Sequence, residues 1–357
     1  MNDHVFDHWT TVMARWQRRP SRRTVLAGGL VGGLLAGVPG VRPGSAHLTP
    51  ARRECDLGCT NSTCGEILVE CTLFPIDDIW NTSIDQLPVA IQSDAFIASI
   101  GMDTGLHPDF GAGLYEGQPL GIPFVRVPAD QALVEILFEY VEESDPGPYP
   151  IPGDAPVEGG SCGTGDRHVI VVQEETCQLF ELYNAEPKPD GSWQASSGAR
   201  FDLTSSALRP AEWTSADAAG LPILPGLVRY EEIETGVISH ALRFTAELTQ
   251  EAYVWPARHQ AGASTDPAVP PLGQRFRLKD RVAIDDFSPT NQIILQALKT
   301  YGMMLADNGS AWFLSGSPDD RWDNDDLHEL QERIHGSDFE AVDCSSLMGD
   351  PDSGQIA

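Results

Sequence analysis

The chain has 357 residues, 41% of them hydrophobic and eight of them Trp, so it can fold around a core and is not a disordered chain. Lys and Arg total 23 against 52 Asp and Glu, a formal net charge of −29. Because so acidic a surface repels phosphates, we expect no nucleic acid as a partner.

Residues 1–46 have the organisation of an export signal. Basic residues precede an apolar run of about 14 residues, too short to span a bilayer comfortably, and small residues lead to a cleavage point after Ala46. The stretch Ser21–Leu26 resembles a twin-arginine signal, with Val25 where the usual consensus has Phe. This resemblance implies export after folding. We expect a secreted or periplasmic protein with no membrane contact after cleavage; an uncleaved anchor helix is the alternative.

Residues 47–73 are predicted to form a cysteine-rich arm. In an exported protein, four cysteines so close together predict disulfide bonds, with three pairings open, among Cys55, Cys59, Cys64 and Cys71. Zinc or iron–sulfur ligation is the alternative, but the spacings match neither pattern. Cys162 and Cys177 bracket a strand-like stretch and would form a second disulfide. Cys344 is then free or paired with the arm.

The acidity of the chain without its signal is larger still. Residues 47–357 carry 17 basic and 50 acidic side chains. We interpret this excess as solubility in a salty or acidic habitat. The alternative is structural Ca²⁺, because carboxylates are dense over residues 319–326, but the EF-hand spacing is absent. We therefore predict no metal site and no cofactor, with structural Ca²⁺ as the alternative.

Strand patterns dominate the first half of the chain. A short helix is predicted from Ser93 to Gly101, and RYEEIETG predicts a helical turn or two closed by Gly236. Strands are predicted at residues 122–127, 132–143, 169–172 and 178–183, the last two as a hairpin. His107 and Asp109 lie in a surface loop, where they form a simple turn or, as the alternative, a ligand pair. Asp166 and His168 precede the strand at residues 169–172.

The second half holds the strongest helix signal. Ser288 suits an N-cap with Pro289 at the first helical position, and we expect this helix to continue to Asn308 and Gly309. A short acidic helix is predicted over residues 323–336. Further strands are predicted at residues 237–244, 252–259, 273–279 and 310–316.

The predicted fold is mainly β (α+β). It consists of a single sandwich-like β domain over residues 74–343 with one packed C-terminal helix, and a loose tail over residues 344–357. The segments 165–173, 207–233, 240–245, 252–259 and 301–316 resemble those of a group of uncharacterised secreted bacterial proteins. This resemblance covers most of residues 74–343, implies one domain there, and implies no activity.

The stretch 208–259 is the predicted site, because His, Arg and Asp occur there within core-like sequence. Glu181, in a neighbouring strand, lies on the face opposite Phe180 and Leu182, and that face lines either a cleft or open solvent. Glu181 and Asp217 would be the carboxylate pair of a glycoside hydrolase. His240 or His259 would be the base of a lyase. Substrate would be bound by Arg243, Arg258 and Trp255.

Motifs for other chemistries are absent from the sequence. It contains no G-x-S-x-G, no H-E-x-x-H, no P-loop and no G-x-G-x-x-G. We therefore expect a secreted protein that acts on an extracellular polysaccharide as a glycoside hydrolase or lyase. The alternative is a non-catalytic carbohydrate-binding or cell-envelope protein. Either role requires the ionisable side chains to meet in a recess open to solvent.

Overall fold

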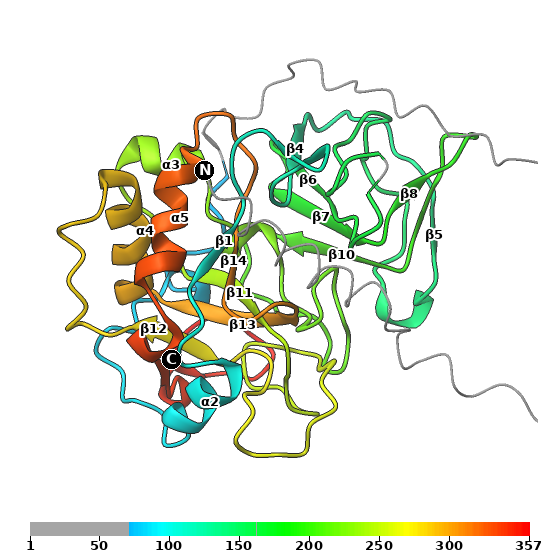
Figure 1. The fold of residues 1–357 in the computed structure, drawn as a ribbon. Coiled ribbons are helices and arrows are strands. Elements are labelled where there is room, and N and C mark those ends of the chain that lie inside the picture. The colour runs from blue at the N-terminus through cyan, green and yellow to red at the C-terminus, as the bar shows by residue number, and fades with distance from the viewer. Residues whose placement is uncertain (1–70, 162) are drawn as a thin grey trace, which may run out of the picture. The chain divides into compact units, whose positions relative to one another are not determined.

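The computed structural model describes residues 71–161 and 163–357. The predicted signal peptide and the cysteines at 55, 59, 64 and 162 lie outside the described residues. Within the described part, strands outnumber helices and build several sheets, which confirms the mainly β, α+β prediction (Figure 1). None of the described helices is both long and apolar enough to cross a bilayer.

The largest sheet has six strands and mixed direction. Its strands, in spatial order, are β1 (His107–Asp109), β14 (Phe313–Ser315), β11 (Leu242–Ala246), β13 (Met303–Asn308), β12 (Arg275–Leu278) and β15 (Phe339–Val342). Aromatic side chains pack beneath it: Trp312 stacks against Phe244 and Phe339 and meets Phe276 edge-on. All four are fully buried and lie in the main core.

The second sheet has four strands and is buried on both faces. It consists of β10 (Ser197–Asp202), β7 (Gln178–Tyr183), β6 (Val169–Gln173) and β4 (Phe124–Val127). Because side chains alternate along a strand, Ile170 and Val172 face the main core, while Val169 and Val171 face a smaller core. A three-stranded sheet borders the smaller core: β5 (Ile136–Phe138), β9 (Trp193–Ala195) and β8 (Glu186–Pro187). A short hairpin pairs β2 (Leu114–Tyr115) with β3 (Gln118–Pro119).

Helices α2 (Ser93–Ile100), α4 (Pro289–Thr300) and α5 (Asn324–Arg333) pack against the six-stranded sheet (Figure 1). The short helix α3 (Tyr230–Thr235) lies between strands β10 and β11 in the chain. Helix α4 begins as predicted, with the Ser288 hydroxyl accepting a hydrogen bond from the Asn291 amide.

The predicted end of this helix at Asn308 is wrong. Gly302 has φ +66°, which ends the helical path, and Met303–Asn308 forms strand β13 beside β11. The predicted strand over residues 252–259 is also wrong, since only an isolated bridge forms at Tyr253. Strand β11 begins only at Leu242, so His240 lies outside it.

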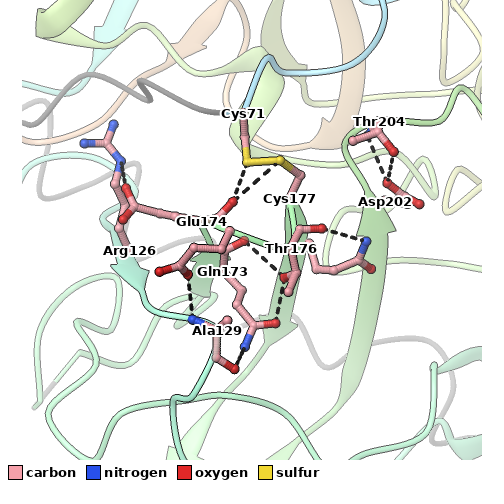
Figure 2. Close-up of a disulfide and its surroundings, with 11 residues drawn as sticks. Cys71, Arg126, Ala129, Gln173, Glu174, Thr176, Cys177, Asp202 and Thr204 are labelled. Carbon is pink, nitrogen blue, oxygen red and sulfur yellow. Dashed lines mark hydrogen bonds and ion pairs between the residues drawn. A yellow bond between two sulfur atoms is a disulfide. The ribbon is translucent and has the colours of Figure 1, made fainter.

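One disulfide joins the start of the described chain to the β6–β7 hairpin. Cys71 pairs with Cys177, with Cα atoms 5.4 Å apart (Figure 2). The predicted pairing of Cys177 with Cys162 is therefore wrong, and Cys71 does not pair within the arm. Cys177 lies at the hairpin turn with φ +50°, and its side chain is bonded to Cys71 there. Cys344 is free.

Residues 344–357 differ from the loose tail that we expected. Asp352 forms an ion pair with Arg258, and the Ser353 carbonyl accepts a hydrogen bond from the Trp255 indole. Gln355 forms a bridge with Asp78. The tail is therefore hydrogen-bonded to the body of the domain.

Candidate functional site

The centre of the candidate site is a buried ion pair between Arg243 of β11 and Asp217. The Arg243 Nε and Nη2 atoms donate to the two Asp217 carboxylate oxygens at 2.8 and 3.1 Å, and both side chains are almost fully buried. Nη1 donates to the Ser315 hydroxyl at 2.6 Å. This bidentate arrangement uses the planar fork of the guanidinium and fixes its orientation.

Strand pairing places further polar groups beside Arg243. Asp109 of β1 pairs with Ser315 of β14, which lies next to Arg243 on β11. Residues paired across neighbouring strands project from the same face, so all three belong to one row. This row joins parts of the chain that are far apart in sequence.

A β-bulge adds Asp307 to the same face. The register between β11 and β13 shifts between Phe244 and Thr245, so Leu305 pairs with Phe244 but Asp307 pairs with Thr245. Without the extra residue, Asp307 would project into the core. With it, the carboxylate lies 3.6 Å from Arg243 Nη2.

The four-stranded sheet contributes a second cation. The Nδ1 atom of His168, the residue before β6, lies 2.6 Å from Glu158 Oε2, and its Nε2 atom lies 3.1 Å from the Ala216 carbonyl. Both partners are acceptors, so both nitrogens must donate and the ring is an imidazolium. Burial opposes that charge, but Glu158 and Asp166 outweigh it and raise the pKa of His168 to about 9. His168 and Glu158 are thus an ion pair at neutral pH.

Three further carboxyl groups lie around these two pairs: Asp109, Asp166 and Asp307. Burial, helped by the charge of Asp217, raises the pKa of Asp307 to about 8. Burial also raises the pKa of Asp166, and Glu158 adds to the effect. In contrast, the His168 charge outweighs burial at Glu158 and holds its pKa below the usual value. The cluster therefore contains both protonated and ionised carboxyls near neutral pH.

The cluster is open to solvent. Asp109 is exposed, and Glu158, Asp166 and Asp307 are partly exposed. The pKa of Asp109 is nevertheless raised to about 7. Desolvation by the surrounding protein is the larger cause, and the charge of Glu158 is the second. Asp109 is thus a carboxyl at the protein surface that is surrounded by other protein groups.

Tyr183, at the end of β7, contributes an aromatic ring. Its ring centroid lies 5.8 Å from that of His168, and the ring is partly exposed. Burial and the charges of Asp166 and Asp307 raise the pKa of the phenol above its ordinary value. The phenol has no hydrogen-bond partner among the described residues, so its hydroxyl can bind a ligand.

The two predicted catalytic carboxylates, Glu181 and Asp217, lie next to this cluster, but both are fully buried from solvent. Glu181 does share a face with Leu179, as the alternation predicted, yet that face is buried, and neither a cleft nor solvent borders it. Its carboxylate accepts hydrogen bonds from the amides of Ile223 and Leu224 at 2.9–3.0 Å. Burial raises its pKa to about 7 against these bonds. Both carboxylate oxygens of Asp217 accept hydrogen bonds from Arg243.

The other predicted residues lie apart from the cluster. His240 is buried against Glu232 and Arg229. The Nδ1–H group of His259 donates to the Ala218 carbonyl at 2.8 Å, and its Nε2 atom lies 3.9 Å from Glu143 Oε2. Arg258 donates to two backbone carbonyls and to Asp352, and Trp255 donates to Ser353. The expectation that Glu181, Asp217, His240 and His259 share one open recess is therefore wrong.

Sequence reasoning noted three of the cluster residues but did not choose them. Asp109 was interpreted as part of a turn, and Asp166 and His168 were placed before a strand, although strand ends are where functional groups commonly lie. Asp307 was not considered, because it lay within the predicted helix. Only the adjoining Arg243 and Asp217 belonged to the predicted site.

The comparisons with known proteins add no assignment. No family model, no curated protein and no solved structure matches the chain. Among the described residues, no group of three or more His, Cys, Asp or Glu side chains is arranged to hold a metal ion.

Proposed function

We propose that the protein is exported and acts on an extracellular polysaccharide as a glycoside hydrolase. The observation that carries this proposal is the pair of opposite pKa shifts in one solvent-exposed cluster, raised at Asp109 and lowered at Glu158. Cleavage of a glycosidic bond needs one carboxyl that holds a proton and one that is ionised. The charge of Glu158 helps to raise the pKa of Asp109, and together the two carboxyls meet this need.

In this mechanism Asp109 is the general acid, and Glu158 is the nucleophile or general base. Asp109 donates its proton to the glycosidic oxygen as the bond to the anomeric carbon breaks. Glu158, ionised beside His168, either attacks that carbon or removes a proton from the attacking water. Arg243 and Asp217 do not touch the substrate; they position the row that carries Asp109, through Ser315.

The lyase route has less support. A lyase needs a free base near a cation that neutralises a uronate, and His240 and Arg258 both have partners within the protein. The alternative of a non-catalytic carbohydrate-binding or envelope protein is supported by the same exposed cluster and by the partly exposed ring of Tyr183. Turnover distinguishes it from the hydrolase.

The test uses purified protein on a panel of polysaccharides, with reducing ends as the readout. Asp109→Asn and Glu158→Gln should each lower turnover by about 100-fold or more, the usual contribution of a general acid or base. The control is Asp154→Asn, which removes an exposed carboxylate elsewhere. Binding without product from the wild-type protein would favour the non-catalytic alternative. Undiminished turnover by both variants would reject this acid–base pair.

A further inference from the structure

We infer that a recess between β4, α3 and the segment after β14 binds a neutral sugar unit of the polysaccharide, beside the acidic cluster. We name it the Ser317 recess, after a serine that lines it. It encloses about 300 Å³ of space, part of which is continuous with bulk solvent. This inference rests on the proposed function and adds a second binding position for the same substrate.

Strand pairing places the Ser317 recess next to the acidic cluster. The Val228 amide donates to the Ser315 carbonyl at 3.1 Å, and the Ser317 amide donates to the Val228 carbonyl at 2.9 Å, so residues 315–317 are extended. Because side chains alternate along an extended chain, Ser317 lies on the same face as Ser315, about 7 Å further along. Ser315 accepts from Arg243 and pairs with Asp109. A sugar chain that passes Asp109 along this face therefore reaches the recess.

Ser317 has a hydroxyl that the protein itself does not use. The residue is only 6% exposed, and its amide and carbonyl are hydrogen-bonded to Val228 and Trp322. Its hydroxyl has no hydrogen-bond partner among the described residues. Buried polar side chains normally have a partner. Since Ser317 lines the recess, a hydroxyl group of a bound sugar can be that partner.

The walls of the recess are apolar and held in place. They are formed by two prolines and two aromatic residues, Pro123, Pro318, Phe124 and Tyr230. Arg321 lies over the Tyr230 ring, 4.4 Å from its centroid, and Trp322 meets that ring edge-on at 4.7 Å. The Trp322 indole also donates to the Ser317 carbonyl at 3.1 Å. Tyr230 and Ser317 thus contact the same indole, so little of the site has to be ordered when a ligand binds.

The charged residues that line the recess already have partners in the protein. Glu231 pairs with Arg126 at 3.2 Å, and Asp319 pairs with Arg321 at 2.6 Å. A cationic ligand would have to compete with these arginines, and an anionic ligand would meet two carboxylates. A neutral sugar has neither difficulty, because the carboxylate oxygens can accept hydrogen bonds from its hydroxyl groups. Apolar walls with a few polar groups are what such a ring requires.

The experiment measures binding to the Asp109→Asn protein, so that turnover does not consume the ligand. Neutral hexasaccharides of glucose, mannose, galactose and xylose are compared with a hexasaccharide of galacturonate by titration calorimetry at pH 7. We expect at least one neutral chain to bind, and to bind at least tenfold more tightly than the uronate chain.

Variants made in the same Asp109→Asn protein then locate the binding. Ser317→Ala should weaken the tightest-binding neutral chain about fivefold, the usual contribution of one hydrogen bond. Tyr230→Ala should weaken it at least tenfold, because a wall of the recess is lost. Ser346→Ala changes an exposed serine elsewhere and should leave the affinity unchanged. Ser317→Ala should also leave the free energy of unfolding unchanged in urea denaturation, because no hydrogen bond within the described protein is lost.

Several results would overturn the inference: no binding of any neutral chain, equal or tighter binding of the uronate chain, or unchanged affinity in either Ser317→Ala or Tyr230→Ala. A fall in the free energy of unfolding of Ser317→Ala would assign the hydroxyl a structural role and would also overturn it. Failure of the proposed hydrolase gives a different result. The protein with Asp109 intact would then bind the neutral chain, Ser317→Ala would weaken that binding, and no reducing ends would appear.

Discussion

Replacement of Arg243 by Met tests the ion pair on which the candidate site is built. Met keeps much of the apolar volume but leaves the Asp217 carboxylate without its two donors, at a position with 0% exposure. Removing one partner of a buried pair costs about 3–5 kcal/mol, because the remaining charge is desolvated and unmatched. Ser315 also loses its partner. We therefore expect the free energy of unfolding to fall by about 4 kcal/mol.

Two further variants make this prediction specific. Asp217→Asn should cost less than Arg243→Met, because Arg243 keeps Ser315 and can pair with Asp307 at 3.6 Å. Lys188→Met, which breaks a pair exposed to solvent, should cost no more than about 1 kcal/mol. Urea denaturation at pH 7 followed by Trp fluorescence measures all three. A loss below about 1 kcal/mol for Arg243→Met, or one equal to that of Lys188→Met, would refute the reasoning.

Three other predictions concern stability. Loss of the Cys71–Cys177 disulfide, which closes a separation of 106 residues, should cost about 4 kcal/mol in Cys71→Ser, while Cys344→Ser serves as a control measured in the same denaturation series. The pKa of Asp307 is raised from 3.8 to about 8, so the protonated carboxyl favours the folded state. Its contribution to the free energy of unfolding is complete below about pH 4 and is lost as the pH rises through 8. The free energy of unfolding of Asp307→Asn should therefore rise relative to that of the wild type from pH 5 to pH 9. Arg275 donates to the carbonyls of Ile79, Thr82 and Tyr301. Arg275→Met should leave each of these acceptors without its donor, at a cost of about 1–3 kcal/mol each, and should make residues 75–90 sensitive to limited proteolysis. An unchanged digestion rate would contradict this role.

Local patterns in the sequence predicted the elements that depend on local physics. The N-cap at Ser288, the β6–β7 hairpin and the helix that ends at Gly101 all follow from capping, alternation and glycine, which act over a few residues. The prediction for Met303–Asn308 was wrong because a short apolar run has the same sequence pattern in a buried helix as in a central strand. Only its pairing with β11 decides between them.

The site was harder to predict because it depends on pairing between distant strands. Nothing near Asp109 in the sequence indicates that its neighbour across the sheet is Ser315, or that Arg243 lies beyond it. The bulge that turns Asp307 toward Arg243 is likewise a property of register and not of the residues around it. Glu181 illustrates the opposite error: its face was predicted, but the segment that contains Ile223 and Leu224 covers the carboxylate on that face.

The distribution of the cations explains why we favour hydrolysis over elimination at this cluster. Elimination from a uronate needs a positive group free to bind the sugar carboxylate while a base removes the neighbouring proton. In the described cluster, the guanidinium of Arg243 is paired with Asp217 and the imidazolium of His168 with Glu158, so both cations already have carboxylate partners in the protein itself. The pKa values of Asp109 and Asp307 are raised, and a carboxyl that holds its proton is what general acid catalysis requires. An acidic cluster whose cations are paired internally is therefore suited to protonate a leaving oxygen and unsuited to hold an anionic sugar.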